Sequence, residues 1–387
     1  MSYKYAVIGA GRQGTASAYD FIMFGEAEKI LLIDSRQDAI DKALEKLGNL
    51  TGKDICKGVT LNINDAEALE HLLKDVDAIV SGVPYYYNHY LTELAIKVGA
   101  NFVDFGGNTD VVKEQLNLDE SALEANISII PDCGMDPGLN ISLIMYIADI
   151  FDSPVSIKSY GAGLTQFPKP PWNFELTFHI NGLTNEYFGN ALFLRDGEVE
   201  EIPCLSELET IDFPDSLGQL EAAVTSGGLS TLPYTLKGKL KTLENKTLRY
   251  PGHWQQFKAF SDLGLFDTKK IEVGNCVISP REFYHKLIED QITSDTTKDI
   301  GIIRIFAEGI KNGRDSRYEL ELIDYYDPKT GFTAMQRLTG WHASMIAILA
   351  NKGKVRKGAV SVENAVPGRD IKMEIEKRGI KITEKFH

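Results

Sequence analysis

Short apolar segments alternate with amphipathic segments through the first third of the chain. Six apolar runs rich in β-forming residues lie at residues 5–9, 29–36, 59–64, 76–84, 100–107 and 124–134. The first five runs are separated by segments with helical patterning, at residues 15–25, 35–47, 65–75 and 86–99. Strands that alternate with helices predict an α/β fold with a doubly wound parallel sheet of the Rossmann type and right-handed crossovers.

The pattern changes after residue 140. Polar and apolar positions now alternate along residues 155–164, 174–183, 191–202, 270–277, 299–310 and 317–327. Such alternation, interrupted by turns, predicts a second α+β domain built on a mostly antiparallel sheet. Residues 333–351 then form one long amphipathic segment, typical of a helix, at which we expect the chain to return to the first domain.

Chain length supports this division, because 387 residues exceed the usual size of a single hydrophobic core. We expect a dinucleotide-binding domain at residues 1–133, rejoined by about 335–387. Residues 134–334 form the expected second domain.

Composition is that of an ordinary globular enzyme, with 43% hydrophobic and 25% charged residues. A formal charge of −14 without a basic patch argues against nucleic acid or an anionic membrane as partner. The first strand begins almost at once, which leaves no room for an export signal, and no apolar run is long enough to span a bilayer. Four widely spaced cysteines show no paired metal spacing. We therefore expect a cytoplasmic protein with reduced thiols and no metal site.

A glycine motif connects the first apolar run to the first helical segment. Gly9, Gly11 and Gly14 form the pattern GxGxxG, with Arg12 and Gln13 between the last two glycines. In a strand-turn-helix context the first glycine permits the tight turn, the second lets the backbone approach a pyrophosphate, and the third allows close packing of helix and strand. The free N–H groups at the start of the helix favour phosphate there. The context predicts a dinucleotide site.

Asp34 is expected at the end of the strand formed by the second apolar run, twenty residues after Gly14. A carboxylate at this position can accept both ribose hydroxyls of NAD and repels the 2′-phosphate of NADP. Asp34 could instead cap the helix that follows, and Arg36 could partly tolerate a 2′-phosphate. The spacing favours NAD.

Other candidate residues follow from the rule that such sheets bind ligands beyond the carboxyl ends of their strands. Asn62 is expected near the adenine, and Val83 and Pro84 under the nicotinamide ribose. Asp104 and Asp132 end adjacent strands at the same crevice.

The chain resembles the saccharopine dehydrogenase-like family, most closely its short branch of L-lysine 6-dehydrogenases. The resemblance rests on the glycine motif together with PDCGMDPGLN (131–140), TLRYPGHWQQFKAFSDLGLF (247–266) and RLTGWHAS (337–344). It covers nearly the whole chain, and TLRYPGH is its most specific part. It implies a nicotinamide-dependent enzyme that acts at a carbon–nitrogen bond of an amino acid, with a second domain that binds substrate and forms a homodimer.

Several residues gain candidate roles from their chemistry and this resemblance. Arg249 presents a planar, permanently charged fork suited to a substrate carboxylate, although an ion pair with a structural acid is the competing interpretation. Asp132 or Asp104 would hold the amine or take its proton. His253 could relay a proton, although a lone histidine before Trp254 is more commonly a packed residue.

Aromatic and turn residues complete the candidates. Tyr85 and Tyr86 could line the substrate site, although aromatic residues in a crossover helix usually belong to the core. Asp136, in the turn signal DPG, is interpreted as a turn or capping residue.

The function expected from these features is NAD-dependent oxidative deamination of L-lysine at Cε. A saccharopine or carboxynorspermidine dehydrogenase or reductase would use many of the same residues. A nucleotide-binding sensor without turnover is the alternative from a different class.

Overall fold

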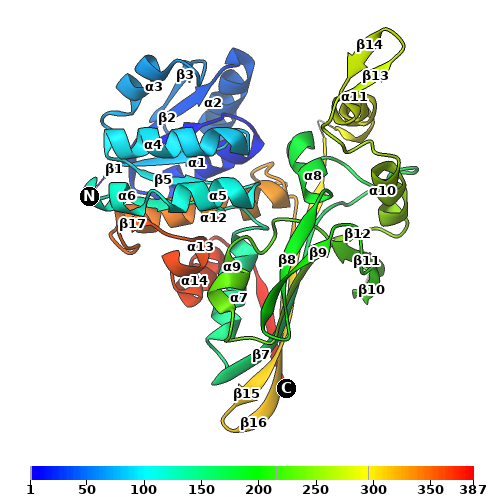
Figure 1. The fold of residues 1–387 in the computed structure, drawn as a ribbon. Helices are drawn as coiled ribbons and strands as arrows, with labels where there is room; N and C mark the ends of the chain where they lie inside the picture. Colours follow the sequence, from blue (N-terminus) through cyan, green and yellow to red (C-terminus); the bar gives the residue numbers. More distant parts are fainter. Residues whose placement is uncertain (1, 215–216, 295) are drawn as a thin grey trace.

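The protein is built around two large β-sheets that lie side by side (Figure 1). The computed structural model describes residues 2–214, 217–294 and 296–387. Helices cover both faces of the first sheet, and the second sheet extends away from it with helices α8, α10 and α11 at one end (Figure 1).

The first sheet has seven parallel strands in the order β17-β6-β5-β4-β1-β2-β3. Its strands are β1 (Tyr3–Ile8), β2 (Ala27–Asp34), β3 (Cys56–Thr60), β4 (Ala78–Ser81), β5 (Asn101–Asp104), β6 (Ser128–Ile130) and β17 (Gly358–Ala359). Its connecting helices are α1 (Arg12–Phe24), α2 (Gln37–Thr51), α3 (Ala66–Leu73), α4 (Asn88–Val98), α5 (Thr109–Leu116) and α6 (Asp119–Glu124), with a 3₁₀ turn η1 (Tyr85–Tyr87) before α4. The prediction of a doubly wound parallel sheet is confirmed.

Alternation along β1 shows why both faces carry helices. Tyr5 and Val7 belong to the core on one face of the sheet, whereas Ala6 and Ile8 belong to the core on the other. All four side chains are at most 2% exposed. A strand buried on both faces reads as a continuous apolar run, as the sequence shows.

The structure adds two features to the sequence-based picture of this sheet. Helices α5 and α6 form the crossover between β5 and β6, where no helix is predicted. The two residues of β17 extend the sheet as a seventh strand, which is too short to leave a hydrophobic pattern.

The second sheet has nine strands, and only the pairing of β12 with β7 is parallel. Its strands are β7 (Ser153–Thr165), β8 (Asn190–Arg195), β9 (Glu198–Pro203), β10 (Glu209–Asp212), β11 (Gln219–Val224), β12 (Thr242–Arg249), β15 (Asp299–Lys311), β16 (Arg314–Tyr325) and β18 (Ile382–Phe386). The remaining elements of this region are α7 (Leu139–Ala148), α8 (Ile180–Glu186), α9 (Leu232–Leu236), α10 (His253–Asp262), α11 (Pro280–Ile292) and a separate hairpin of β13 (Ile271–Val273) and β14 (Cys276–Ile278). The expected second domain on a mostly antiparallel sheet is confirmed.

One expected strand is absent. Residues 174–179 belong to no strand or helix, and α8 begins at Ile180, where the His179 side chain accepts a hydrogen bond from the Asn181 amide. The alternation has another cause, because Phe174 and Leu176 are buried in an aromatic cluster with α10 and α11 instead of in a sheet. The prediction of a strand over 174–183 is therefore wrong.

The long helix α12 (Ala334–Asn351) joins the two regions. Gly340 lies so close to α1 that an added Cβ would be 2.6 Å from the Gln13 carbonyl oxygen. Ser17 on α1 donates to the Gly340 carbonyl at 2.7 Å. After α13 (Val362–Ala365) and α14 (Gly368–Lys377), β18 pairs with β16 of the second sheet. The C-terminal segment thus contributes one strand to each sheet. None of the helices in the described part of the chain combines the length and apolar character needed to cross a membrane.

Candidate functional site

The glycine turn after β1 has the geometry that a bound dinucleotide requires. Gly9 has φ +105°, and a Cβ there would lie 2.7 Å from the Gly82 carbonyl oxygen. A Cβ on Gly14 would lie 1.9 Å from the Gly9 carbonyl oxygen. A Cβ on Gly11, in contrast, would meet no atom within 4 Å. Gly9 therefore permits the tight turn, and Gly14 permits close packing of α1 against that turn. Gly11 leaves open space at the N-terminus of α1. These residues fit a nicotinamide dinucleotide.

Asp34 lies beside this turn at the end of β2. Its carboxylate accepts hydrogen bonds from the Ala10 amide at 2.9 Å and from the Arg36 amide at 2.9 Å. The Arg36 side chain is 65% exposed, and its Nε is 3.9 Å from the Asp34 carboxylate. No side-chain cap is formed on α2. The Asp34 side chain is thus fixed next to the glycine turn, where a ribose would lie.

Arg12 and Gln13 contact the second domain with their side chains. Arg12 donates to the carbonyl oxygens of Leu176 at 2.8 Å and Ser294 at 3.2 Å, and Gln13 donates to Thr177 at 3.2 Å. Their backbone amides belong to the first turn of α1. The two side chains therefore connect the glycine turn to the opposite wall of the site.

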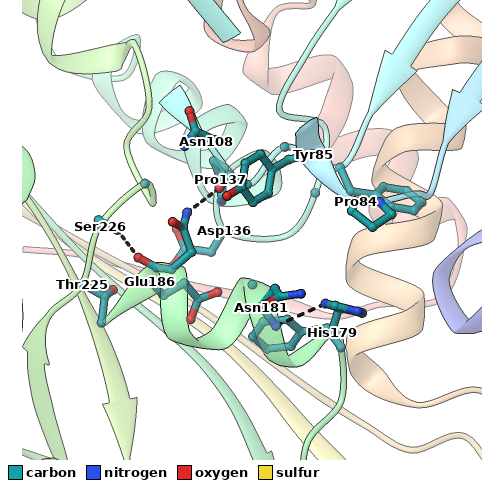
Figure 2. Close-up of a pocket in the computed structure, with 18 of the residues that line it drawn as sticks. Pro84, Tyr85, Asn108, Asp136, Pro137, His179, Asn181, Glu186, Thr225 and Ser226 are labelled. Carbon is teal, nitrogen blue, oxygen red and sulfur yellow. Dashed lines mark hydrogen bonds between the residues drawn. The ribbon is translucent and has the colours of Figure 1, made fainter. Parts of the chain in front are cut away.

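A cavity of about 530 Å³, the main cavity, lies between the two domains. From the first domain its lining includes Gln13, Val83, Pro84, Tyr85, Tyr86, Gly106 and Asp132, and Asp136 follows at the start of the second domain. From the second it includes Asn181, Asn185, Glu186, Thr225, Ser226, Asn245, Arg249 and Arg281, and α12 adds Met335 and Thr339. Figure 2 shows Pro84 and Tyr85 across this space from Glu186 and Thr225.

The predicted residues after β4 all line the main cavity, namely Val83, Pro84, Tyr85 and Tyr86. Tyr86 is 58% exposed, so it is not a core residue. Asn62, after β3, is not part of this lining, and its side chain accepts a hydrogen bond from the Asn64 amide.

Asp132 and Asp104 differ in their access to the main cavity. Asp132 lines it, whereas Asp104 is buried behind it and accepts hydrogen bonds from Gly106 N, Asp132 N and Gln115 Nε2. Burial, and then the Asp104 charge, raises the pKa of Asp132 to about 8. Asp132 Oδ1 has no hydrogen-bond partner among the described residues, and Oδ2 accepts from Ser230. Of the two, only Asp132 belongs to the lining of the main cavity.

Arg249 shares the main cavity with two further carboxylates. Its Nη2 is 3.9 Å from the Glu186 carboxylate, its Nε donates to the Tyr187 hydroxyl at 3.0 Å, and its Nη1 donates to the Leu248 carbonyl. Burial raises the pKa of Glu186 to about 8 and that of Asp136 to about 7, although the Arg249 charge lowers both. Asp136 does not cap α7; its carboxylate accepts from Asn140 at 2.6 Å and from Asn245 at 3.1 Å. In the second domain, the Arg249 guanidinium therefore lies near two carboxyl groups, Glu186 and Asp136, whose burial disfavours ionisation.

His253 lies behind this group and not in the lining of the main cavity. Its ring stacks on Phe257 with centroids 4.0 Å apart, and burial, followed by the Arg249 charge, holds its pKa well below the usual range. The Tyr187 hydroxyl lies 3.0 Å from His253 Nε2 and accepts the bond from Arg249. The hydrogen bond between the Tyr187 hydroxyl and the His253 ring therefore orients the tyrosine that holds Arg249.

The lining residues that were not predicted as site residues include Glu186, Asn185 and Asp136. Glu186 and Asn185 end the short helix α8, which begins inside the segment 174–183 that the alternation assigns to a strand, so no local pattern marks them. For Asp136 a signal existed, because it belongs to the segment PDCGMDPGLN on which the family resemblance rests.

Comparisons with known proteins agree with this architecture. The model of the saccharopine dehydrogenase NADP binding domain matches residues 5–130, and that of the saccharopine dehydrogenase C-terminal domain matches residues 134–380. The chain belongs to the saccharopine dehydrogenase family. The resemblance inferred from the sequence is thereby confirmed at the family level.

Individual members of the saccharopine dehydrogenase family are distant in sequence. The NADP(+), L-glutamate-forming saccharopine dehydrogenase of Pyricularia oryzae is 23% identical over 246 residues, covering 61% of this chain and 54% of that protein. The carboxynorspermidine synthase of Vibrio alginolyticus is 24% identical over 228 residues, covering 54% of each chain. The matched region thus spans about half the length of these curated relatives.

Two solved structures share the fold over the whole chain. The apo L-Glu-forming saccharopine dehydrogenase of Saccharomyces cerevisiae has a TM-score of 0.76 at 17% identity, and 100% of each chain is covered. The homospermidine synthase of Legionella pneumophila, solved in complex with NAD, has a TM-score of 0.66 at 14% identity, with 100% of this chain and 92% of that chain covered.

Proposed function

We propose that this protein is a NAD-dependent dehydrogenase that oxidatively deaminates L-lysine at Cε, giving aminoadipate semialdehyde and ammonia. The observation that carries the proposal is the charge pattern of the main cavity. Asp132, Asp136 and Glu186 line it together with Arg249. Three carboxylates that are costly to ionise, together with the guanidinium groups of Arg249 and Arg281, suit a ligand with ammonium groups and a carboxylate.

The α-amino-acid end of the substrate would bind at Arg249. Among the described residues, the ion pair of the Arg249 Nη2 atom is with the Glu186 carboxylate, 3.9 Å away, and Nη2 would donate to a substrate carboxylate. Glu186, which gains stability in its charged form from a nearby cation, would accept from the α-ammonium group. His253 and Tyr187 act as positioning residues because they hold the guanidinium in this orientation.

Asp132 would take the proton from the reacting amine. A free lysine ammonium has a pKa near 10.4 and carries no lone pair, so the amine must lose a proton before oxidation. Asp132, with a pKa raised to about 8, is a stronger base than an ordinary carboxylate. Its partnerless Oδ1 is available for that proton. Asp104 supports this role by its hydrogen bond to the Asp132 amide and by its charge.

A nicotinamide cofactor would supply the hydride acceptor. Gly9, Gly11 and Gly14 with the backbone of Arg12 and Gln13 would hold its pyrophosphate. Asp34 would hold the adenine-side ribose and favour NAD over NADP. Val83 and Pro84, which line the cavity, would lie at the nicotinamide end, and Asn62 at the adenine end. Water would then hydrolyse the imine formed at Cε of the substrate.

The test is a panel of amines and amino acids offered with NAD or NADP, with NADH absorbance and ammonia release both measured. Lysine with NAD alone should give both signals. Cofactor binding without turnover on any compound would instead support the nucleotide-binding sensor.

A saccharopine or carboxynorspermidine dehydrogenase or reductase is the second candidate. The activities of the relatives favour it, since these relatives include a saccharopine dehydrogenase and a carboxynorspermidine synthase. If this second candidate is correct, the panel will show turnover only when a keto acid or aldehyde is added to the amine, or when saccharopine itself is the substrate.

A homodimer in the cytoplasm is part of the same proposal. Apolar side chains are exposed on the hairpin β13–β14 and on α11, with Val277 64% and Leu287 54% exposed. An isolated two-stranded hairpin is marginally stable, so contact with a second copy would stabilise it. The mass of the protein in solution, measured by light scattering, tests the dimer.

A further inference from the structure

A second cavity of about 350 Å³ adjoins the main cavity. Both are lined by Asn185, Ser226, Gly227, Gly228 and Asn245, so the loop after β11 forms part of the wall between them. The second cavity is also lined by residues exposed to solvent, including Asp110, Asn190 and Tyr234, the last being 51% exposed. Water in it can therefore exchange with bulk solvent.

Asp132 and Ser230 face the two cavities from opposite sides of this wall. Asp132 lines the main cavity and not the second, whereas Ser230 lines the second and not the main one. The Ser230 hydroxyl donates a hydrogen bond to Asp132 Oδ2, and both residues are buried. The pair thus connects the substrate side to a water-accessible cavity through one carboxylate and one hydroxyl.

The backbone at both residues is in the left-handed region. Asp132 has φ +61° and Ser230 has φ +45°. A non-glycine residue in this region is uncommon and its strain persists only where the surrounding structure imposes it. Ser230 follows Gly227 and Gly228 in the same loop, and the strained backbone brings its hydroxyl to the carboxylate.

Groups on the other sides of Asp132 offer no comparable route. Asp104 accepts three hydrogen bonds and is fully buried. The buried Cys133 thiol donates to the Ile130 carbonyl. Glu363 on α13 acts on Asp132 through its charge, and its carboxylate accepts from Thr231 at 2.9 Å and Thr235 at 2.7 Å. The backbone of Gly107, which lines both cavities, also hydrogen-bonds to Asp132. Among the described side chains, the Ser230 hydroxyl is the polar contact between Asp132 and the second cavity.

We propose that Ser230 relays the substrate-derived proton from Asp132 to water in the second cavity. This rests on the proposed function only in that an amine proton reaches Asp132. The two carboxyl oxygens are chemically equivalent and exchange by a half-turn of the group. The carboxyl then gives its proton to Ser230 Oγ while Oγ releases its own proton to water. Asp132 ends as a carboxylate, Ser230 is unchanged, and the water carries the proton away.

The decisive variant is Ser230→Gly, because it removes the hydroxyl while glycine accepts φ +45° without strain. We expect kcat in dilute buffer to fall about tenfold to hundredfold, with the Michaelis constant for the amine and the affinity for NAD unchanged. Small proton-carrying buffers such as imidazole should restore part of the rate. The acid limb of the pH profile should move to higher pH, because the Ser230 hydrogen bond lowers the pKa of Asp132.

Tyr234→Phe is the matched control. It also removes one hydroxyl from the lining of the second cavity, but it does not break the contact between Ser230 and Asp132. Its rate and pH profile should match those of the native protein. Ser230→Thr keeps a hydroxyl and should retain more of the rate than Ser230→Gly.

Two results would overturn the relay. One is a Ser230→Gly variant with native kcat in dilute buffer. The other is a titration of Asp132, followed by NMR of carbon-labelled aspartate, that is the same in native protein and in Ser230→Gly. The titration needs no turnover. The titration therefore tests the relay even if the proposed function is wrong. Failure of the proposed function would appear separately, as a native protein that turns over no compound of the amine panel.

Discussion

The glycine turn and the group around Arg249 form opposite walls of one site and are built in different ways. The glycine turn uses backbone groups and missing side chains from six consecutive residues, Gly9 to Gly14. The Arg249 group uses charged side chains from the turn before α7, the end of α8 and the end of β12. The first wall has no room for added atoms at Gly9 and Gly14, and the second depends on the balance of buried charges. Steric and electrostatic changes should therefore act separately on cofactor and substrate.

The largest expected effect is on cofactor binding by Gly11→Val. The open space above Gly11 lets the variant fold, but its methyl groups occupy the approach of the pyrophosphate. We expect at least about a hundredfold loss of NAD affinity by calorimetry, with little change in Tm.

Gly14→Val provides the contrast to Gly11→Val. Its Cβ would lie 1.9 Å from the Gly9 carbonyl oxygen, so Tm itself should fall. Unimpaired NAD binding by a folded Gly11→Val protein would contradict the role given to the glycine turn.

The next effect concerns the substrate wall. Arg249→Lys keeps the charge but loses the planar fork, and a charge-assisted hydrogen bond contributes roughly 1.5–3 kcal/mol, or about tenfold to hundredfold in the Michaelis constant. NAD affinity should stay unchanged. Arg249→Ala should act more strongly and remain folded, because Glu186 and Asp136 can take protons once the cation is lost.

Comparing lysine with cadaverine, which lacks the carboxylate, sharpens this test. The native protein should prefer lysine, and Arg249→Ala should discriminate poorly between the two. Equal use of both by the native protein would show that Arg249 is structural.

A smaller effect is expected at Asp34. Asp34→Ala should narrow the preference for NAD over NADP by about tenfold, through lost NAD affinity, because the carboxylate no longer accepts the ribose hydroxyls. Arg36→Ala is the control, since that side chain is 65% exposed. Equal affinity of the native protein for both cofactors would show that Asp34 does not select between them.

The smallest effect is on stability as a function of pH. The pKa values of Asp132 and Glu186 are raised to about 8 and that of Asp136 to about 7. In the folded protein these three carboxyls therefore hold more protons than in the unfolded chain between the ordinary carboxyl pKa values and about pH 8. Their contribution to stability must fall as pH rises through this window.

Glu186→Gln should reduce the slope of Tm against pH in this window, and lysine should raise the Tm of the native protein most at the alkaline end. An unchanged slope in Glu186→Gln would mean that this carboxyl titrates normally in the folded protein. Calorimetric scans across the pH range measure both.

The sequence by itself determined the first wall and the class of fold. Gly9, Gly11, Gly14 and Asp34 lie within one β-turn-α-β unit, so their spacing along the chain fixes their spacing in space. Strands buried on both faces leave uninterrupted apolar runs, which is why the parallel sheet could be predicted. The carboxyl ends of β4 and β6 likewise placed Val83, Pro84 and Asp132 at the main cavity.

Only the tertiary structure decided the second wall. Asp136, Glu186 and Arg249 are separated by fifty or more residues along the chain, and no periodicity relates them. The chemistry of His253 permitted a proton relay, yet burial against Phe257 and Tyr187 places it behind the site. Ser230 carries no sequence signal at all, because its role depends on a strained loop meeting a carboxylate from the other domain. The spacing of residues along the chain is enough to specify a site made of backbone groups, such as the glycine turn. The pKa values of the carboxyl groups near Arg249 depend instead on burial and on charges that are distant in sequence. Both arise only when the two domains pack together.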